Sequence, residues 1–258
     1  MAKVKKNRTL AIGARTASGR SRRLPRIILA ILVLLLAALA GFLVMQYLGS
    51  DTHQTKIVQQ HFSDESISIA PVTPQQRNSY KVAPDRPRYI SIPTLGINQA
   101  RVMALGVKTP NKNGQQQLDV PKNINDVGWY DCQINPVANK RCSRPTLPGG
   151  GDTNTAMIMA GHTCFSRTMR CVFDKISNLK SGDQIIIERG DGQKINFAVR
   201  RVDVLKLADV DMSKAIQPIE AGKEGLTLIT CAGTYRGTKD ANGVPTADKR
   251  VLVYAVLE

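Results

Sequence analysis

From about residue 88 onward the chain is a series of short apolar runs separated by Gly, Pro, Asn and Asp. Runs of this length suit β-strands, and residues of this kind terminate strands in turns. Gly190-Asp191-Gly192 lies between two of the runs and predicts a hairpin. The segment is long enough to bury one core, so we expect a single β-barrel or sandwich. The expected strands are 89–92, 101–105, 118–120, 155–160, 184–189, 194–205, 226–231 and 250–257, with a short helix over 171–179.

An uncharged apolar run over residues 27–45 follows a basic tail. Residues 1–26 contain nine Lys or Arg and no Asp or Glu. A helix of this length spans roughly 28 Å, close to the hydrocarbon thickness of a bilayer. Positive charge before the run predicts a cytoplasmic N-terminus and an extracellular remainder. We therefore expect a basic cytoplasmic tail at 1–26 and a single-pass transmembrane anchor at 27–48, in the cell membrane.

A cleavable signal peptide is the alternative, since Ala38-Leu39-Ala40 has the small residues of a cleavage site. The apolar run continues past this site to Met45, which favours an uncut anchor. Both alternatives place the bulk of the protein outside the cytoplasm. Residues 49–87 are rich in Gln, Ser, Thr, Asp and Pro and predict a flexible stalk, with a short helix over 55–62 as one option.

The formal net charge of the chain is +16, and nine of these charges lie in the N-terminal tail. From Asp51 onward there are 27 basic and 20 acidic residues. The tail suits contact with anionic lipid headgroups. The remainder has no basic stripe along a helix, so we expect no nucleic-acid partner.

The five cysteines divide into four in loops and one at the end of a predicted strand. An extracellular domain permits disulfides. Pairing of Cys132 with Cys142 and of Cys164 with Cys171 would leave Cys231 alone. Four cysteines allow three pairings, and free thiols are a further alternative.

A metal site is a third use for these residues, since His162, Cys164 and Cys171 lie close together in the sequence. Structural zinc sites usually contain a Cys-x-x-Cys pair, which is absent here. We therefore expect no metal and no other cofactor.

Three residues with the chemistry of a thiol enzyme lie at ends of predicted strands. Cys231 ends the run 226–231, and His162, the only histidine after the stalk, follows the run 155–160. Arg250 opens the last strand. A neighbouring imidazole or guanidinium favours the thiolate, and the imidazole can also transfer protons. A guanidinium can stabilise a developing oxyanion.

In this order the three residues resemble those of the sortases. Residues 227–231 read TLITC and fit the T-L-x-T-C signature of the family, and the histidine and arginine segments also fit. The similarity covers residues 88–258 and is greatest to the class E and class F groups. Further segments that are similar to the family are AGH at 160–162, RVLVYA at 250–255, IPTLGI at 92–97, VGWY at 127–130, and VFDKI and KSGD at 172–176 and 180–183.

The resemblance implies a mainly β fold, an eight-stranded sortase-type β-barrel with short helices, preceded by the transmembrane helix. It implies a catalytic domain at 88–258 that acts as a cysteine transpeptidase, a thiol peptidase of the hydrolase type. Cys231 would form a thioester with a sorting signal, His162 would transfer protons, Arg250 would stabilise the oxyanion, and Thr230 would hold the substrate backbone. The partners would be secreted proteins with a C-terminal sorting signal and an amine acceptor, either a cell-wall precursor or a Lys of a pilin-like subunit.

Three other functions are compatible with parts of this pattern. A purely hydrolytic cysteine peptidase on the same barrel would use the same acyl-enzyme. A membrane-tethered binding module without catalysis would keep Cys231 as a buried strand thiol. A disulfide oxidoreductase is disfavoured because the chain lacks Cys-x-x-Cys.

Overall fold

The computed structural model describes two units, which divide the chain into Met1–Gly49 and Ser50–Glu258. The described residues are 28, 31–44, 67–106, 118–134, 145–165, 169–235 and 246–258.

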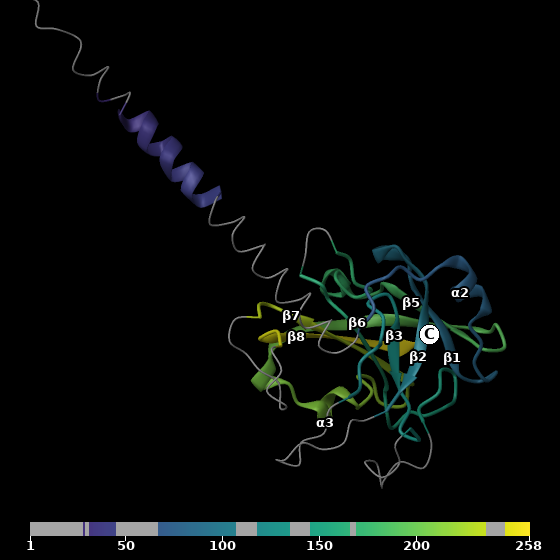
Figure 1. Ribbon diagram of the computed structural model, residues 1–258. Helices are drawn as coiled ribbons and strands as arrows, with labels where there is room; N and C mark the ends of the chain where they lie inside the picture. Colours follow the sequence, from purple (N-terminus) through teal and green to yellow (C-terminus); the bar gives the residue numbers. More distant parts are fainter. Residues whose placement is uncertain are drawn as a thin grey trace, which may run out of the picture. The chain divides into compact units, whose positions relative to one another are not determined.

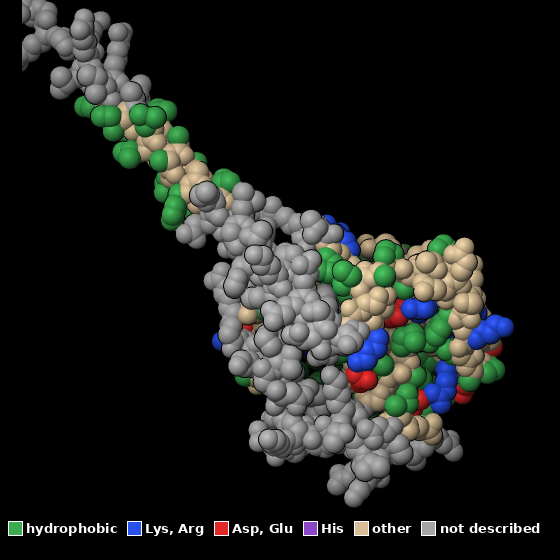
Figure 2. All heavy atoms as spheres, in the orientation of Figure 1, with side chains coloured by type: hydrophobic (Ala, Val, Ile, Leu, Met, Phe, Trp, Pro, Cys, Tyr) green, Lys and Arg blue, Asp and Glu red, His purple; other side chains and the backbone are tan. Residues whose placement is uncertain are grey.

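In the first unit residues 31–44 are helical, and the apolar side chains of this helix are exposed (Figure 2). Within the described ranges no helix is both long enough and apolar enough to cross a membrane. The predicted anchor at 27–48 includes residues outside these ranges and stays a prediction.

Eight strands of the second unit close into a barrel in the order β1-β2-β3-β4-β7-β8-β6-β5 (Figure 1). This confirms the expected mainly β, eight-stranded barrel. Two neighbouring pairs, β2 with β3 and β4 with β7, are parallel, and the other pairs are antiparallel. The strands are β1 Pro87–Ile92, β2 Ile97–Leu105, β3 Val127–Tyr130, β4 Met157–Gly161, β5 Gln184–Arg189, β6 Lys194–Lys206, β7 Gly225–Ala232 and β8 Lys249–Leu257.

Short helical segments lie between the strands and before the first one. They are α2 Pro74–Ser79, η1 Pro93–Leu95, η2 Ile176–Asn178, η3 Leu207–Asp209 and α3 Met212–Ala215.

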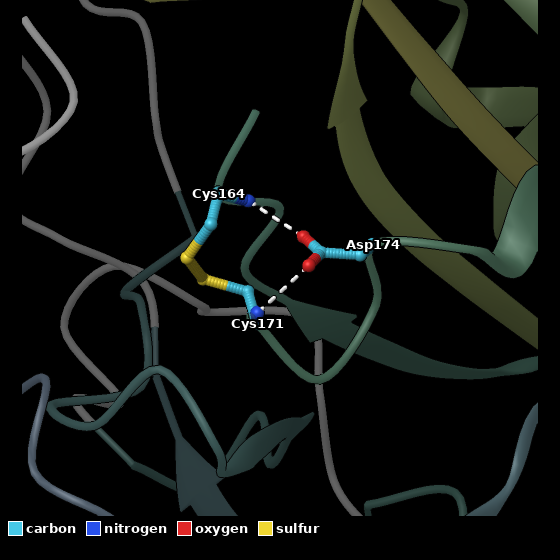
Figure 3. Close-up of side chains that lie close together, drawn as sticks. All are labelled: Cys164, Cys171 and Asp174. Carbon is cyan, nitrogen blue, oxygen red and sulfur yellow. Dashed lines mark hydrogen bonds between the residues drawn. A yellow bond between two sulfur atoms is a disulfide. The ribbon is translucent and has the colours of Figure 1, made fainter. Parts of the chain in front are cut away.

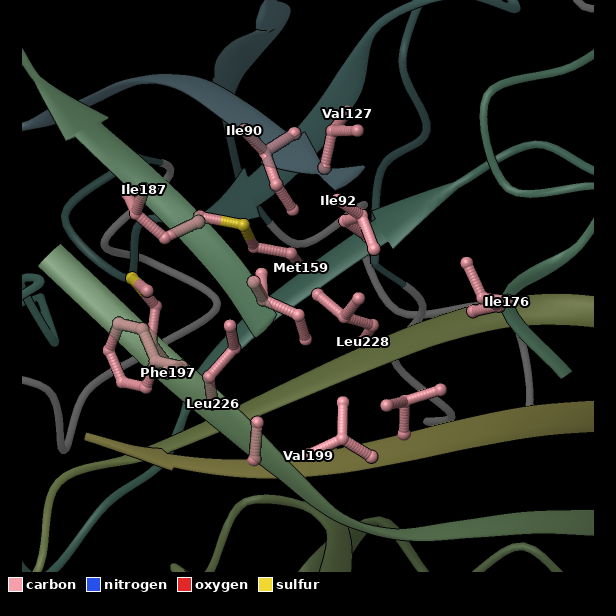
Figure 4. Packing of buried hydrophobic residues seen from close by; sticks show 14 of the residues in the cluster. Ile90, Ile92, Val127, Met159, Ile176, Ile187, Phe197, Val199, Leu226 and Leu228 are labelled. Carbon is pink, nitrogen blue, oxygen red and sulfur yellow. The ribbon is translucent and has the colours of Figure 1, made fainter. Parts of the chain in front are cut away.

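The barrel interior is filled by apolar side chains from most of the strands, which point toward one another (Figure 4). Met159, Leu226 and Leu228 are among them and are almost fully buried. Each such side chain contributes about 1.5–3 kcal/mol relative to an exposed one. Successive strand residues face opposite sides of the sheet, so residues one position away from these face outward.

The sequence placed seven of the eight strands within a few residues of their observed bounds and missed β3. Residues 118–120 form no strand, and Val127–Tyr130 does instead. Glycine is disfavoured in strands, so the presence of Gly128 argued against predicting a strand here. A Cβ at Gly128 would lie 2.2 Å from Cδ1 of Leu105, so a larger residue there would require the Leu105 side chain to move.

The helix expected over 171–179 is wrong, since only Ile176–Asn178 forms a 3₁₀ turn there. The N–H groups of Val172 and Phe173 donate to the carbonyls of Ile124 and His162, at 3.0 Å each. In a helix, backbone N–H groups donate to carbonyls of the same helix. Here these two N–H groups donate to residues that are distant in the sequence.

Residues 67–86 lie within the predicted stalk but are held against the barrel. Thr73 and Gln76 form a capping box at the start of α2. The Tyr80 hydroxyl donates to the Val102 carbonyl at 2.6 Å. The barrel unit therefore begins before residue 88, and the rest of the stalk, at 49–66, lies outside the described residues.

Candidate active site

Cys231 and Arg250 are direct partners in the antiparallel pairing of β7 with β8. Side chains of paired residues face the same side of the sheet, with Cβ atoms roughly 4.5–5.5 Å apart. Both residues are half-buried. The register therefore sets the guanidinium and the thiol on one face at one end of the barrel.

His162 follows β4 directly, and β4 runs parallel to β7. The last pair joining these strands is Ala160 with Ile229. His162 and Cys231 each lie two residues beyond that pair, so they leave adjacent strands at the same edge of the barrel. The structure thus brings the three predicted residues to one site.

This site opens on the outer side of the barrel wall. Leu228 and Val251 belong to the interior cluster, and Cys231 and Arg250 are odd-numbered steps away from them along their strands. The Cys231 side chain packs instead against a smaller apolar cluster that includes Tyr235. Side chains on the outer wall can be reached by a peptide without opening the core.

The imidazole of His162 is oriented by the segment before β3. Its Nε2 lies 2.8 Å from the Pro121 carbonyl oxygen. A carbonyl oxygen only accepts hydrogen bonds, so Nε2 carries the proton in this contact. Nδ1 is then the nitrogen that gains and loses a proton in acid–base chemistry.

The guanidinium of Arg250 is held by the loop that precedes β8. Nη1 donates to the carbonyls of Ala247 and Lys249 at 2.9 and 2.8 Å, and Nη2 donates to the Thr246 hydroxyl at 2.9 Å. Among the described residues, Nε–H and the second Nη2–H have no partner. The planar group is fixed by three bonds and keeps two donors that can serve a substrate oxygen.

Thr230 faces the opposite way from Cys231 and is almost fully buried. Its hydroxyl donates to the Gly161 carbonyl at 2.7 Å and lies 2.6 Å from the Thr163 hydroxyl. These bonds join the end of β7 to the two residues that flank His162. The predicted contact between Thr230 and substrate backbone stays a prediction. The contacts that are observed for its side chain join the strand ends that carry His162 and Cys231.

A pocket of about 410 Å³ adjoins Cys231. Its walls are partly aromatic, and one of them, Phe165, packs edge-to-face on Tyr235 with ring centroids 5.5 Å apart. Neither His162 nor Arg250 is among the described residues that line it. We call it the thiol pocket; its lining is Thr163, Phe165, Arg170, Phe173, Asp174, Ser177, Thr230, Cys231, Ala232, Gly233 and Val251.

The loop after His162 is closed by the disulfide Cys164–Cys171, which confirms that predicted pair (Figure 3). The Asp174 carboxylate accepts the backbone N–H groups of both cysteines, at 2.7 and 2.9 Å. Burial raises the pKa of Asp174, although these two bonds oppose the shift. The two sulfurs and the Asp174 carboxylate lie close together, but sulfurs bonded to each other are not thiolate ligands.

Only one cysteine of the other predicted disulfide lies within the described residues. Cys132 is disulfide-bonded, and its expected partner, Cys142, lies outside the described residues. Cys231 is the free cysteine of the described residues. This separates it from the loop cysteines, as the sequence predicted.

Several functional contacts were not predicted from the sequence. Each of three residues forms a hydrogen bond with a residue that lies 10 to 67 positions away in the sequence. They are Asp174, Thr163 and Pro121. The only signal for Asp174 was its place in the family-like segment 172–176, which gives no partner.

The family model for the sortase domain matches residues 90–258. The chain belongs to the sortase family. A comparison with curated proteins finds no match. The class E or class F subgroup is not confirmed and stays a prediction.

Solved sortase structures are similar to the chain at low identity. The SrtA sortase from Actinomyces oris is 20% identical, with 67% of this chain and 79% of that chain covered and a TM-score of 0.41. Sortase C-1 from the same organism is 18% identical, with coverage of 79% and 98% and a TM-score of 0.41. A lid mutant of Streptococcus agalactiae sortase C1 is 14% identical, with coverage of 81% and 88% and a TM-score of 0.41. The family assignment rests on the domain match.

Proposed function

We propose that this sortase is a membrane-anchored cysteine transpeptidase that cleaves a sorting signal of secreted proteins and transfers them to an amine acceptor. The observation that carries the proposal is the strand register. It pairs Cys231 with Arg250 and sets His162 at the matching position of the neighbouring parallel strand. A buried structural thiol would not require these two neighbours.

In the first half-reaction the Cys231 thiolate attacks the carbonyl carbon of the scissile Thr–Gly-type bond. The carbon–nitrogen bond breaks, and protonated His162 gives its proton to the leaving amine. The two open N–H groups of Arg250 stabilise the oxyanion that forms on the way to the thioester.

In the second half-reaction an acceptor amine attacks the thioester carbonyl. The carbon–sulfur bond breaks, an amide forms, and the amine proton passes to His162 while the Cys231 thiolate is restored. No metal or other cofactor takes part in either half. The thiol pocket, with Phe165 and Phe173 in its wall, suits an apolar side chain of the sorting signal.

The proposed setting is the outer face of the cell membrane. The basic tail at 1–26 and the apolar run at 27–45 support a single-pass anchor with a cytoplasmic N-terminus. The acceptor would be a cell-wall precursor or a Lys of a pilin-like subunit.

The test incubates the protein with a library of Thr–Gly-containing peptides, with and without an added amine, and analyses the products by mass spectrometry. We expect amine-dependent ligation in the wild type and none in Cys231→Ala, with His162→Ala and Arg250→Ala each reduced by about 100-fold or more. Cleavage without ligation would support the hydrolytic peptidase. Wild-type ligation by Cys231→Ala would exclude the proposed nucleophile.

A further inference from the structure

A second pocket lies beside the thiol pocket and has a volume of about 510 Å³. Arg170 and Asp174 line both pockets, so the two share a wall. The remaining walls come from the segment around α2, the start of β2 and residues 170–175. We call it the basic pocket, because its charged residues are Arg77, Arg101, Arg170, Lys175 and Asp174.

The four cations of the basic pocket are only partly neutralised within the protein. Arg101 donates from Nε and Nη2 to the two oxygens of Asp126, at 2.9 and 2.7 Å. Arg77, Arg170 and Lys175 form no ion pair with any described residue. Three cations without ion pairs around one cavity favour an anionic occupant.

The single acid of the basic pocket is already engaged. Both oxygens of Asp174 accept backbone N–H groups, from Cys164 and Cys171. The charges of Arg170 and Lys175 also act on this carboxylate. One acid faces these two cations and Arg77, so the basic pocket keeps an excess of positive charge.

The wall of the basic pocket also contains a backbone conformation that side chains disfavour. Gln99 has φ 48°, a left-handed value that non-glycine residues seldom adopt. Two contacts hold it there. Its N–H donates to the Ser91 hydroxyl at 2.9 Å, and its Nε2 donates to Glu188 at 3.3 Å. Such strain is commonly retained where it shapes a functional site.

The two pockets differ in the chemistry that they can bind. The thiol pocket contains the nucleophile and the rings of Phe165 and Phe173, whereas the basic pocket contains cations and amide side chains. Transpeptidation brings two substrates to one sulfur. The two adjacent pockets share Arg170 and Asp174, and the basic pocket adds three further cations, so it is the one that suits an anionic group of a substrate.

We propose that the basic pocket binds an anionic group, a carboxylate or a phosphate, carried by the amine acceptor that resolves the Cys231 thioester. The inference rests on the proposed transpeptidation and adds the chemical class of its second substrate. Arg77, Arg170 and Lys175 hold the anion, and the shared wall directs the amine toward the thioester.

The kinetic test uses the full-length protein in detergent micelles and amines in matched pairs. β-Alanine and its amide form the carboxylate pair, and phosphoethanolamine and ethanolamine form the phosphate pair. The variant is Arg77→Gln with Lys175→Gln, and the control is Lys194→Gln, a basic residue that lines neither pocket. For the anion that the pocket accepts, we expect the double variant to raise the KM of the charged amine by about tenfold or more relative to its uncharged partner. The control should not change this ratio.

The pair that shows the effect identifies the anion as carboxylate or phosphate. Equal changes for charged and uncharged amines in both pairs would overturn the proposal, as would an equal effect of Lys194→Gln.

A binding test separates this proposal from the proposed function. The thermal midpoint of Cys231→Ala is measured with inorganic phosphate or acetate against sodium chloride of equal ionic strength. We expect at least one anion to raise the midpoint, and to raise it less when Arg77→Gln and Lys175→Gln are added. Anion binding without any ligation by the wild type would refute transpeptidation alone. Ligation by the wild type without pocket-dependent anion binding would refute the basic pocket alone.

Discussion

Thr230 connects the end of β7 to the residues on either side of His162. Its hydroxyl connects the Gly161 carbonyl with the Thr163 hydroxyl, on either side of His162. Because Cys231 is the next residue, the same contact fixes the thiol relative to the imidazole.

Thr230→Val should therefore lower both stability and turnover. It removes the contacts with the Gly161 carbonyl and the Thr163 hydroxyl and should cost about 1–3 kcal/mol in the free energy of unfolding. Thr230→Ser keeps the hydroxyl and is the matched control. Urea unfolding and peptide ligation measure the two effects, and equal ligation rates for the Val and Ser variants would contradict the positioning role.

Asp174 should give the stability of the protein a specific pH dependence. Burial raises its pKa in the folded state above the ordinary value. The folded state then binds more protons than the unfolded state between the ordinary and the raised pKa. Its contribution to stability is full below this window and falls as the pH rises through it.

The measurement is the urea midpoint across this pH range for the wild type and for Asp174→Asn. The wild-type midpoint should fall more steeply with rising pH than that of the variant, which has no carboxyl group to titrate. An identical slope in both proteins would show that Asp174 does not carry the effect.

At the residue scale the sequence predicted three residues that the structure brings to one barrel edge, and their catalytic roles stay a prediction. It did not predict the residues that hold them in place. Cys231, His162 and Arg250 could be found because strand ends and residue chemistry are both visible in the sequence. Asp174 and Pro121 could not, because their contacts depend on how loops fold back across the barrel edge.

Among the elements, the disulfide loop at 164–171 has the most direct connection to the site. It begins two residues after His162, and its ends lie 5.3 Å apart between Cα atoms. Cross-linking limits the freedom of the unfolded chain and so stabilises the folded one.

Replacing both cysteines, as Cys164→Ser with Cys171→Ser, should lower the free energy of unfolding by about 2–3 kcal/mol, given the size of the closed loop. It should also slow ligation by loosening the loop after His162. A reductant should reproduce both effects in the wild type and have a smaller effect in the double variant, where the Cys132 disulfide is still present. If the reductant had an effect of equal size on the double variant, that effect would come from a disulfide other than Cys164–Cys171.

The α2 segment is the element that the sequence placed on the wrong side of a boundary. Its polar composition predicted a stalk, but Tyr80 and the capping box of Thr73 bind it to the barrel. The composition of a segment indicates how much apolar area it can bury. It does not predict a single hydrogen bond such as that of the Tyr80 hydroxyl with a strand.

Tyr80→Phe should lower the free energy of unfolding by about 0.5–1.5 kcal/mol, the usual net value of one hydrogen bond. Burial raises the pKa of the Tyr80 hydroxyl, so it stays a donor to Val102. If the Tyr80→Phe variant were as stable as the wild type, the Tyr80 hydroxyl would not be what holds this segment to the barrel.

At the scale of the whole molecule, the chain separates into an N-terminal helical unit and the barrel. Seven of the eight strands could be predicted because their apolar runs are short and are bounded by turn residues. The order of the strands in the barrel could not be derived from local sequence patterns. It places β7 beside β4, although β5 and β6 lie between these two strands in the sequence. It entered the prediction only through the resemblance to sortases.

The most direct test of the account is the mass of the protein after it is mixed with a cleavable sorting-signal peptide and rapidly quenched with acid. We predict an added mass equal to the N-terminal peptide fragment, mapped to Cys231 by digestion and released by hydroxylamine. The adduct should be absent in Cys231→Ala. An adduct on another residue, or peptide cleavage by Cys231→Ala at the wild-type rate, would contradict the central claim that Cys231 is the nucleophile.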